Sequence, residues 1–158
     1  MYSIGDKISY PMHGAGIVEA IEDKEVMGEV QRYYVIKMSY DDMTVMLPTK
    51  PHGAKLTRYI ISTDEAEKVL EYFSDYQENV CENWNKRYRE NVDRIKSGDI
   101  YEVAQVVKTL MCRDKLKGLS SSERKMLSSA KHILISELIL AKNCSKDEME
   151  QTLIRLAG

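Results

Sequence analysis

The one tryptophan of the chain, Trp84, lies among cations and amides in the segment Asn83-Trp84-Asn85-Lys86-Arg87-Tyr88-Arg89. A flat apolar side chain flanked by cations is the kind of residue that enters a minor groove and unstacks a base step. Asn83 has two interpretations, a groove contact or the N-cap of a helix. The segment therefore predicts a nucleic-acid contact made by Trp84 and the basic residues beside it, which are Lys86, Arg87 and Arg89.

A structural interpretation of the same tryptophan competes with this one. Trp84 begins a series of apolar residues at helical spacing, which continues with Tyr88, Val92 and Ile95. Such a series usually faces a hydrophobic core. Spacing alone therefore favours a buried ring, and the neighbouring charges favour an exposed one.

Charge is segregated along the chain although the net charge is only −2. Residues 59–83 contain one lysine or arginine against seven acidic residues, and residues 84–131 contain twelve against six. A basic block of this kind can be a local footprint for phosphates. Charge runs more often only solvate helix faces, so this pattern supports a nucleic-acid surface without requiring it.

Other constellations that could carry chemistry are missing from the sequence. His13, His52 and His132 have no ligand spacing, and there is no phosphate-binding loop or nucleophile signature. Three cysteines with no CxxC pair exclude a disulfide framework and a four-cysteine zinc site, and they favour a reducing cytoplasm. The N-terminus lacks the features of a signal peptide, and the most apolar stretch is too short to span a bilayer. We expect no enzyme, no metal and no cofactor.

Two periodicities divide the chain. Up to about residue 58, short β-branched and aromatic runs alternate with turn residues, which predicts four or five strands in a small, strongly bent sheet. From about residue 60 the period is helical, with capping boxes that begin at Ser62, Ser120 and Ser145. The prediction is an α+β protein with a β domain at 1–58 and an all-α domain at 59–158. Its five helices are expected near 63–76, 84–97, 100–117, 121–142 and 146–156.

Both halves carry motifs of a known family. Residues 5–18, Gly-Asp-Lys-Ile-Ser-Tyr-Pro-Met-His-Gly-Ala-Gly-Ile-Val, are similar to the N-terminal signature of the CarD/CdnL bacterial transcription regulators, a module shared with the transcription-repair coupling factor. The Trp84 segment resembles the family's helical domain. So do Ser97-Gly98-Asp99, Gly118-Leu119-Ser120 and residues 123–127, in the same order. The resemblance covers essentially the whole chain, but the helicase part of the coupling factor is absent.

The resemblance implies a function. A Tudor-like, SH3-like N-terminal domain would bind the protrusion lobe of the RNA polymerase β subunit through the strand Met43-Thr44-Val45-Met46. Many members carry arginine at the positions of Lys24 and Met46, so backbone pairing is expected to carry this contact. The helical domain would meet promoter DNA at the upstream edge of the bubble. Trp84 would be the wedge in the minor groove that keeps the open complex from reannealing, and the basic DNA-facing positions would be Lys86, Arg87, Arg89, Arg124 and Lys125.

Other functions remain open from the residues alone. The chain could be a Tudor-like module that recognises a different protein, with a helical domain for self-association. The basic helices could instead bind RNA or the ribosome. A small enzyme with a pocket between the domains has no nucleophile–base pair in its favour. The preferred hypothesis is a polymerase-binding regulator that contacts DNA without sequence specificity and needs no membrane or small-molecule substrate.

Overall fold

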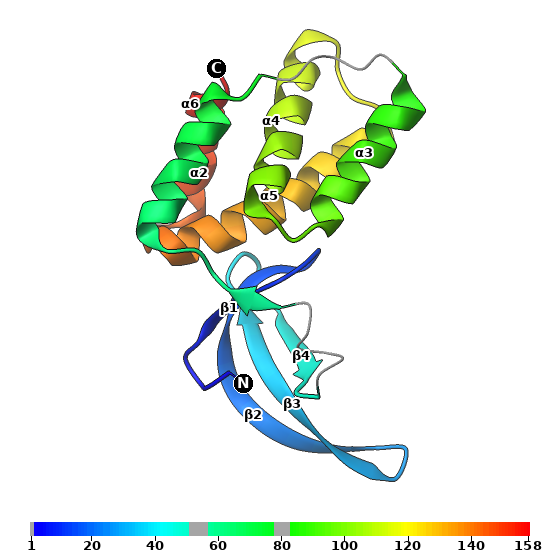
Figure 1. Ribbon diagram of the computed structural model, residues 1–158, viewed down its shortest axis with the longest axis vertical. Helices are drawn as coiled ribbons and strands as arrows, with labels where there is room; N and C mark the ends of the chain where they lie inside the picture. The colour runs from blue at the N-terminus through cyan, green and yellow to red at the C-terminus, as the bar shows by residue number, and fades with distance from the viewer. Residues whose placement is uncertain (1, 51–56, 78–82) are drawn as a thin grey trace.

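The computed structural model describes residues 2–50, 57–77 and 83–158. A curved antiparallel sheet occupies one end of the elongated molecule and a helical bundle occupies the other (Figure 1). The α+β architecture expected from the sequence is therefore confirmed, with the strands first and the helices after them.

The sheet has five described strands in the order β4-β3-β2-β1-β5, and all neighbouring strands are antiparallel. A bulge between Val18 and Ala20 interrupts the pairing of the two longest strands, and bulges increase local bending and twist. These two strands form a long hairpin, whose turn has positive φ at Met27 (53°) and Gly28 (81°), as a two-residue I′ turn requires. The strands are β1 Lys7–Tyr10, β2 Gly14–Val26, β3 Glu29–Met38, β4 Thr44–Pro48 and β5 Arg58–Tyr59.

The described helices begin and end within about one residue of the predicted ranges. In each of the three predicted capping boxes, the serine hydroxyl accepts a hydrogen bond from the backbone N–H of the glutamate three residues later. Asn143 ends the longest helix in the left-handed conformation, with φ of 53°. The helices are α2 Thr63–Asp75, α3 Trp84–Lys96, α4 Ile100–Leu116, α5 Ser121–Lys142 and α6 Lys146–Ala157.

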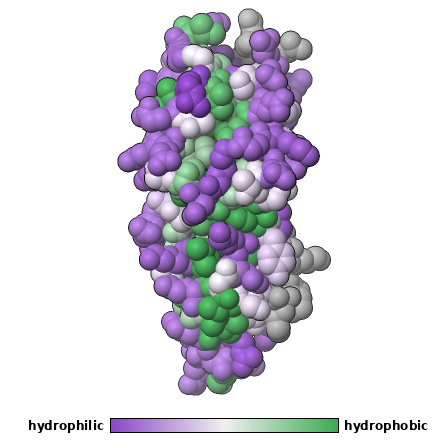
Figure 2. Space-filling model, turned by 90° about the vertical axis from the view of Figure 1, so that its left-hand side faces the viewer, coloured by the Kyte–Doolittle hydropathy of each residue, from purple (hydrophilic) through white to green (hydrophobic). Residues whose placement is uncertain are grey.

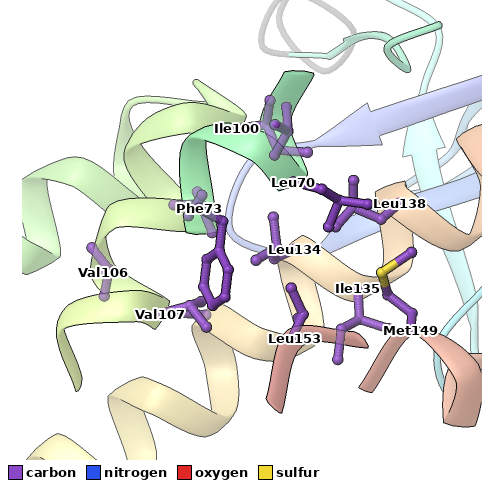
Figure 3. Packing of buried hydrophobic residues seen from close by; sticks show 14 of the residues in the cluster. Leu70, Phe73, Ile100, Val106, Val107, Leu134, Ile135, Leu138, Met149 and Leu153 are labelled. Carbon is purple, nitrogen blue, oxygen red and sulfur yellow. The ribbon is translucent and has the colours of Figure 1, made fainter. Parts of the chain in front are cut away.

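Two groups of buried side chains fill the molecule. The smaller one lies on the sheet and includes Ile8, Val18, Tyr34 and Leu47. The larger one lies among the helices, where Phe73 of α2 points toward Val107 of α4 while side chains of α5 and α6 complete the packing (Figure 3). At the molecular surface of Figure 2, apolar side chains appear in small groups between hydrophilic ones. The division at residues 58 and 59 stays a prediction, and two separate clusters are compatible with it.

Helix α5 joins the two parts of the molecule. The Ser136 hydroxyl accepts from the backbone N–H of Ala15 at 2.8 Å, and the Ser39 hydroxyl donates to the Ser136 carbonyl at 2.7 Å. Glu137, only 2% exposed, accepts two hydrogen bonds from the Arg58 guanidinium, at 2.6 and 2.9 Å, and one from the backbone N–H of Ile61. Charge-assisted hydrogen bonds are stronger than neutral ones, so these contacts hold the sheet against the bundle.

None of the helices in the described ranges combines the length and the apolar character that a bilayer span requires.

Candidate nucleic-acid interface

Trp84 is the first residue of α3 and is 40% exposed. Its ring stacks on Tyr88, with centroids 5.0 Å apart and 17° between the planes. The indole Nε1–H donates to the Oε1 atom of Glu123 at 3.2 Å. One edge of the ring is therefore held in place while part of its surface remains open to solvent.

The core interpretation of the Trp84 series is right for its later members only. Ile95 is buried, and Tyr88 and Val92 pack against the helical core. Trp84 itself belongs to neither buried cluster. The reason is its place at the N-terminus of α3, where the helix has only begun to cover the bundle.

Asn83 caps α3. Its Oδ1 accepts a hydrogen bond from the backbone N–H of Lys86 at 3.1 Å. The cap interpretation of Asn83 is therefore correct, and the exposed residue still lies directly beside the tryptophan.

The structure places Arg87 differently from the solvent-facing position that the basic segment predicted. The residue is 6% exposed, and its Nε donates to Glu123 Oε2 at 3.1 Å. An arginine one position from Lys86 points about 100° further round the helix, which turns it into the bundle. Arg87 is thus an internal partner of Glu123, not a residue that presents its charge to an approaching phosphate.

Glu123 is the residue of this site that sequence reasoning did not recognise. Its pattern indicated only a capping box, and its N–H does bond the Ser120 hydroxyl, at 3.2 Å. The carboxylate is 2% exposed and contacts both Trp84 and Arg87. Burial acts to raise the pKa of Glu123, but the hydrogen bond and charge of Arg87 outweigh it, helped by the Arg113 charge and the indole N–H. The pKa therefore lies below its ordinary value.

The ends of two helices meet at this carboxylate. Glu123 lies in the first turn of α5 and contacts Trp84 at the start of α3, so both helix N-termini lie close together. The partial positive charge of a helix N-terminus attracts anions. The exposed cations of these two first turns and their neighbours add to that potential: Lys86, Arg89, Arg124 and Lys125. Arg124 is partly fixed by its Nε, which donates to the carbonyl of Leu119 at 3.3 Å.

The second set of predicted site residues lies on and beside β4, at one edge of the sheet. Thr44 is exposed, Val45 and Met46 are half-buried, and Met43 precedes the strand and is exposed. Lys24 is exposed on β2, opposite Gln31 of β3. Since β3 lies between β2 and β4, Lys24 is separated from the other four residues by a strand.

On its outer side, β4 has no partner strand among the described residues. Met38 N–H bonds the Met43 carbonyl at 2.8 Å, and Thr49 N–H bonds the Arg32 carbonyl at 3.0 Å. Bonded and non-bonded pairs alternate along an antiparallel ladder. The register pairs Val45 with Ile36, so the backbone N–H and C=O of Val45 point toward β3. The backbone N–H groups of Thr44 and Met46 therefore point to the outer edge.

No cluster of three or more histidine, cysteine or carboxylate side chains suited to a metal ion occurs in the described ranges.

Comparison with known proteins agrees with this arrangement. Residues 2–60 match the CarD-like/TRCF RID domain, and residues 68–154 match the CarD C-terminal domain. The chain is 43% identical over 150 residues to "Putative transcription factor YdeB" of Bacillus subtilis (strain 168), which covers 95% of this chain and 98% of that protein.

The chain belongs to the CarD-like family of transcription factors, as the resemblance indicated. This is a family of transcription factors and not a class of enzymes. Its N-terminal domain, the type shared with TRCF, implies an interaction with RNA polymerase.

Proposed function

We propose that this protein binds the protrusion lobe of the RNA polymerase β subunit through the edge of β4 and stabilises the open promoter complex with Trp84. The single observation that carries the proposal is that the Trp84 indole is partly exposed and held in one orientation. It is open to solvent at a helix N-terminus, held by Glu123 and accompanied by exposed cations.

The proposed contact with polymerase, which would tether the protein, depends on the edge of the sheet. The N–H groups of Thr44 and Met46 point to the outer edge of β4, which has no partner strand among the described residues. Such an edge can accept another strand by β-augmentation, in which main-chain hydrogen bonds supply affinity. This mode does not need the arginines that other family members carry at the positions of Lys24 and Met46. Lys24 would act at a distance from β4, as a charge on the neighbouring hairpin arm.

The proposed DNA contact depends on Trp84 and the cations that α3 and α5 place beside it. An apolar ring that enters a minor groove unstacks a base step, and flanking cations hold the adjacent phosphates. We assign the phosphate contacts to Lys86, Arg89, Arg124 and Lys125, with Asn83 at the groove edge. Arg87 serves by keeping Glu123 ionised and in place, so that the indole keeps its orientation.

The low net charge is compatible with this function. A few neutralised phosphates give sequence-independent binding with a Kd on the order of 10⁻⁴ to 10⁻⁶ M. Attachment to polymerase raises the local concentration and makes such weak binding effective. The hydrogen bonds between α5 and the sheet would keep the polymerase-binding edge and Trp84 at a constant separation.

The experiment that tests the proposal is the decay of purified open complexes with Trp84→Ala. We expect binding to the β lobe to be retained and the extension of open-complex lifetime to fall about tenfold, which corresponds to about 1.4 kcal/mol. Trp84→Phe should retain part of the effect because a ring remains.

The control variant is Ile154→Ala, which removes an exposed apolar side chain on α6. It should behave as the wild type. An open-complex lifetime unaffected by Trp84→Ala, with the protein folded and bound, would reject the wedge. Loss of polymerase binding in the same variant would reject the assignment of polymerase binding to the sheet and DNA contact to the helices.

A further inference from the structure

A cavity of about 520 Å³ lies among the helices. Its walls come from the end of α2, from α3 and α4, and from the end of α6; they include Tyr76, Asn91, Arg113 and Leu156. Cavities of 300–1,000 Å³ are typical for small organic ligands. The volume is therefore that of a small-molecule site, and neither β4 nor the exposed face of Trp84 belongs to it.

Among the described residues, three buried polar atoms have no hydrogen-bond partner, and all three belong to residues that line this cavity. They are Asn91 Nδ2, Thr109 Oγ1 and Arg113 Nε. Asn91 is 1% exposed, so water does not substitute freely for a partner. Buried polar groups in native proteins are nearly always paired, and each exception needs an explanation. Two of these atoms are N–H donors and the hydroxyl can also donate, so the group that would satisfy them is a hydrogen-bond acceptor.

The charge around the cavity points to the same kind of group. The described lining residues include one acidic side chain, Glu90, and four basic ones, which are Arg87, Lys108, Arg113 and Lys117. Arg87 is already paired with Glu123, which leaves the other three as the cations of the described lining for a ligand to meet. Lys108 is largely buried, and its ammonium donates to the backbone carbonyls of Phe73 and Ser74 at 2.8 and 2.9 Å. The ammonium also lies 5.2 Å from the centroid of the Phe73 ring, but neither the carbonyls nor the ring carries a formal negative charge. An anion in the cavity would compensate the charge of the ammonium.

The rest of the wall is apolar and suits the body of such a ligand. Leu116 of α4 and Leu156 and Ala157 of α6 contribute aliphatic surface, and Tyr76 contributes an aromatic ring. We propose that this cavity binds a small organic anion, whose acidic oxygens accept from Asn91 and Arg113 and whose hydrocarbon body packs on the aliphatic wall. The proposal is independent of the polymerase and DNA contacts above.

The test is a fluorescence titration of the full chain with two probes that have the same rings. One is 8-anilinonaphthalene-1-sulfonate, which is anionic, and the other is N-phenyl-1-naphthylamine, which lacks the sulfonate. We expect the anionic probe to bind at least ten times more tightly. Asn91→Leu and Arg113→Met each remove one donor at similar volume and should weaken the anionic probe at least fivefold, with little effect on the neutral one.

The matched control is Arg155→Met, which removes an exposed cation of α6 outside the lining. It should leave both affinities unchanged. Thermal melting checks that each variant is folded. If Asn91→Leu does not fold, Thr109→Val is used in its place.

Three results would overturn the proposal. The first is equal affinity for the two probes, and the second is an anionic-probe affinity that the donor substitutions do not change. The third is a set of amide chemical-shift changes, on addition of the anionic probe, that falls outside the end of α2 and outside α3, α4 and α6.

Discussion

At the scale of single residues, the candidate interface depends on one buried carboxylate. Glu123 accepts from the Trp84 indole at Oε1 and from Arg87 at both carboxylate oxygens. Two free-energy contributions oppose each other at this carboxylate: burial of the charge is unfavourable, and its pairing with a buried cation is favourable. The lowered pKa of Glu123 shows that the partner prevails, which keeps the carboxylate ionised and able to accept from the indole.

Glu123→Gln tests this pairing. The amide keeps an acceptor for Trp84 but leaves Arg87 as a buried charge without its carboxylate, so we expect a loss of about 3 kcal/mol in unfolding free energy at pH 7. Urea unfolding followed by the fluorescence of the single tryptophan measures it. Glu150→Gln, which breaks the more exposed pair with Lys131, should cost less than about 1 kcal/mol. Similar losses in both variants would contradict the assignment.

The same pair predicts a pH dependence. The folded-state pKa of Glu123 lies below its ordinary value of 4.5. Its stabilising contribution is therefore complete above the unfolded pKa and is lost as the pH falls through the folded pKa. The stability difference between the wild type and Glu123→Gln should be constant at neutral pH and shrink in acid below about 4.5. A difference that grows in acid would show that folding raises the pKa of Glu123 instead of lowering it.

At the scale of elements, the open edge of the sheet matters more than the side chains on it. β4 is short and ends at Pro48, whose missing N–H falls at an outward-facing position of the ladder. Proline is tolerated on edge strands at such positions. A proline at Val45 would break a bond to β3 and disturb the fold, so it cannot separate binding from stability.

Met46→Pro separates them. It removes an outward-facing N–H while the bonds of Val45 and Leu47 to β3 remain, so the protein should stay folded and bind the polymerase β lobe at least about tenfold more weakly. Met46→Ala keeps the N–H and should bind nearly as well as the wild type. Isothermal titration calorimetry with the isolated lobe distinguishes them. Equal binding by a folded Met46→Pro protein would refute edge pairing.

At the scale of the whole molecule, the contact between β2 and α5 sets the relation of sheet to bundle. Gly14, with φ of 102°, allows the start of β2 to approach Ser136 so closely that an added Cβ would lie 2.7 Å from the hydroxyl oxygen. The hydrogen bonds of Ser136 to both Ala15 and Ser39 depend on this approach. The junction is therefore a packed interface and not a flexible linker.

Gly14→Ala should weaken this junction. The positive φ costs about 1–2 kcal/mol for a residue with a Cβ, and the collision with Ser136 adds to it. Gly28→Ala is the matched control, because Gly28 also has positive φ (81°) but has open space around it. Thermal and urea unfolding should show Gly14→Ala to be less stable than Gly28→Ala by at least about 1 kcal/mol. Equal stability would mean that the close approach does not stabilise the molecule.

The sequence by itself determined the class of fold, the helix limits and the family. Periodicity and capping boxes are local properties, so Ser62, Ser120 and Ser145 marked their helices without knowledge of any distant contact. The family motifs likewise lie in short runs of adjacent residues.

Only the tertiary structure decided which charges face water and which face each other. Arg87 and Glu123 are 36 residues apart in the chain, so no local sequence pattern indicates that they form a buried pair beside Trp84. The same holds for the contact of Ser136 with the start of β2. It also holds for the three polar atoms that have no hydrogen-bond partner among the described residues and whose residues line one cavity. Burial and pairing depend on how helices pack against each other, and a one-dimensional pattern of charge contains no information about that packing.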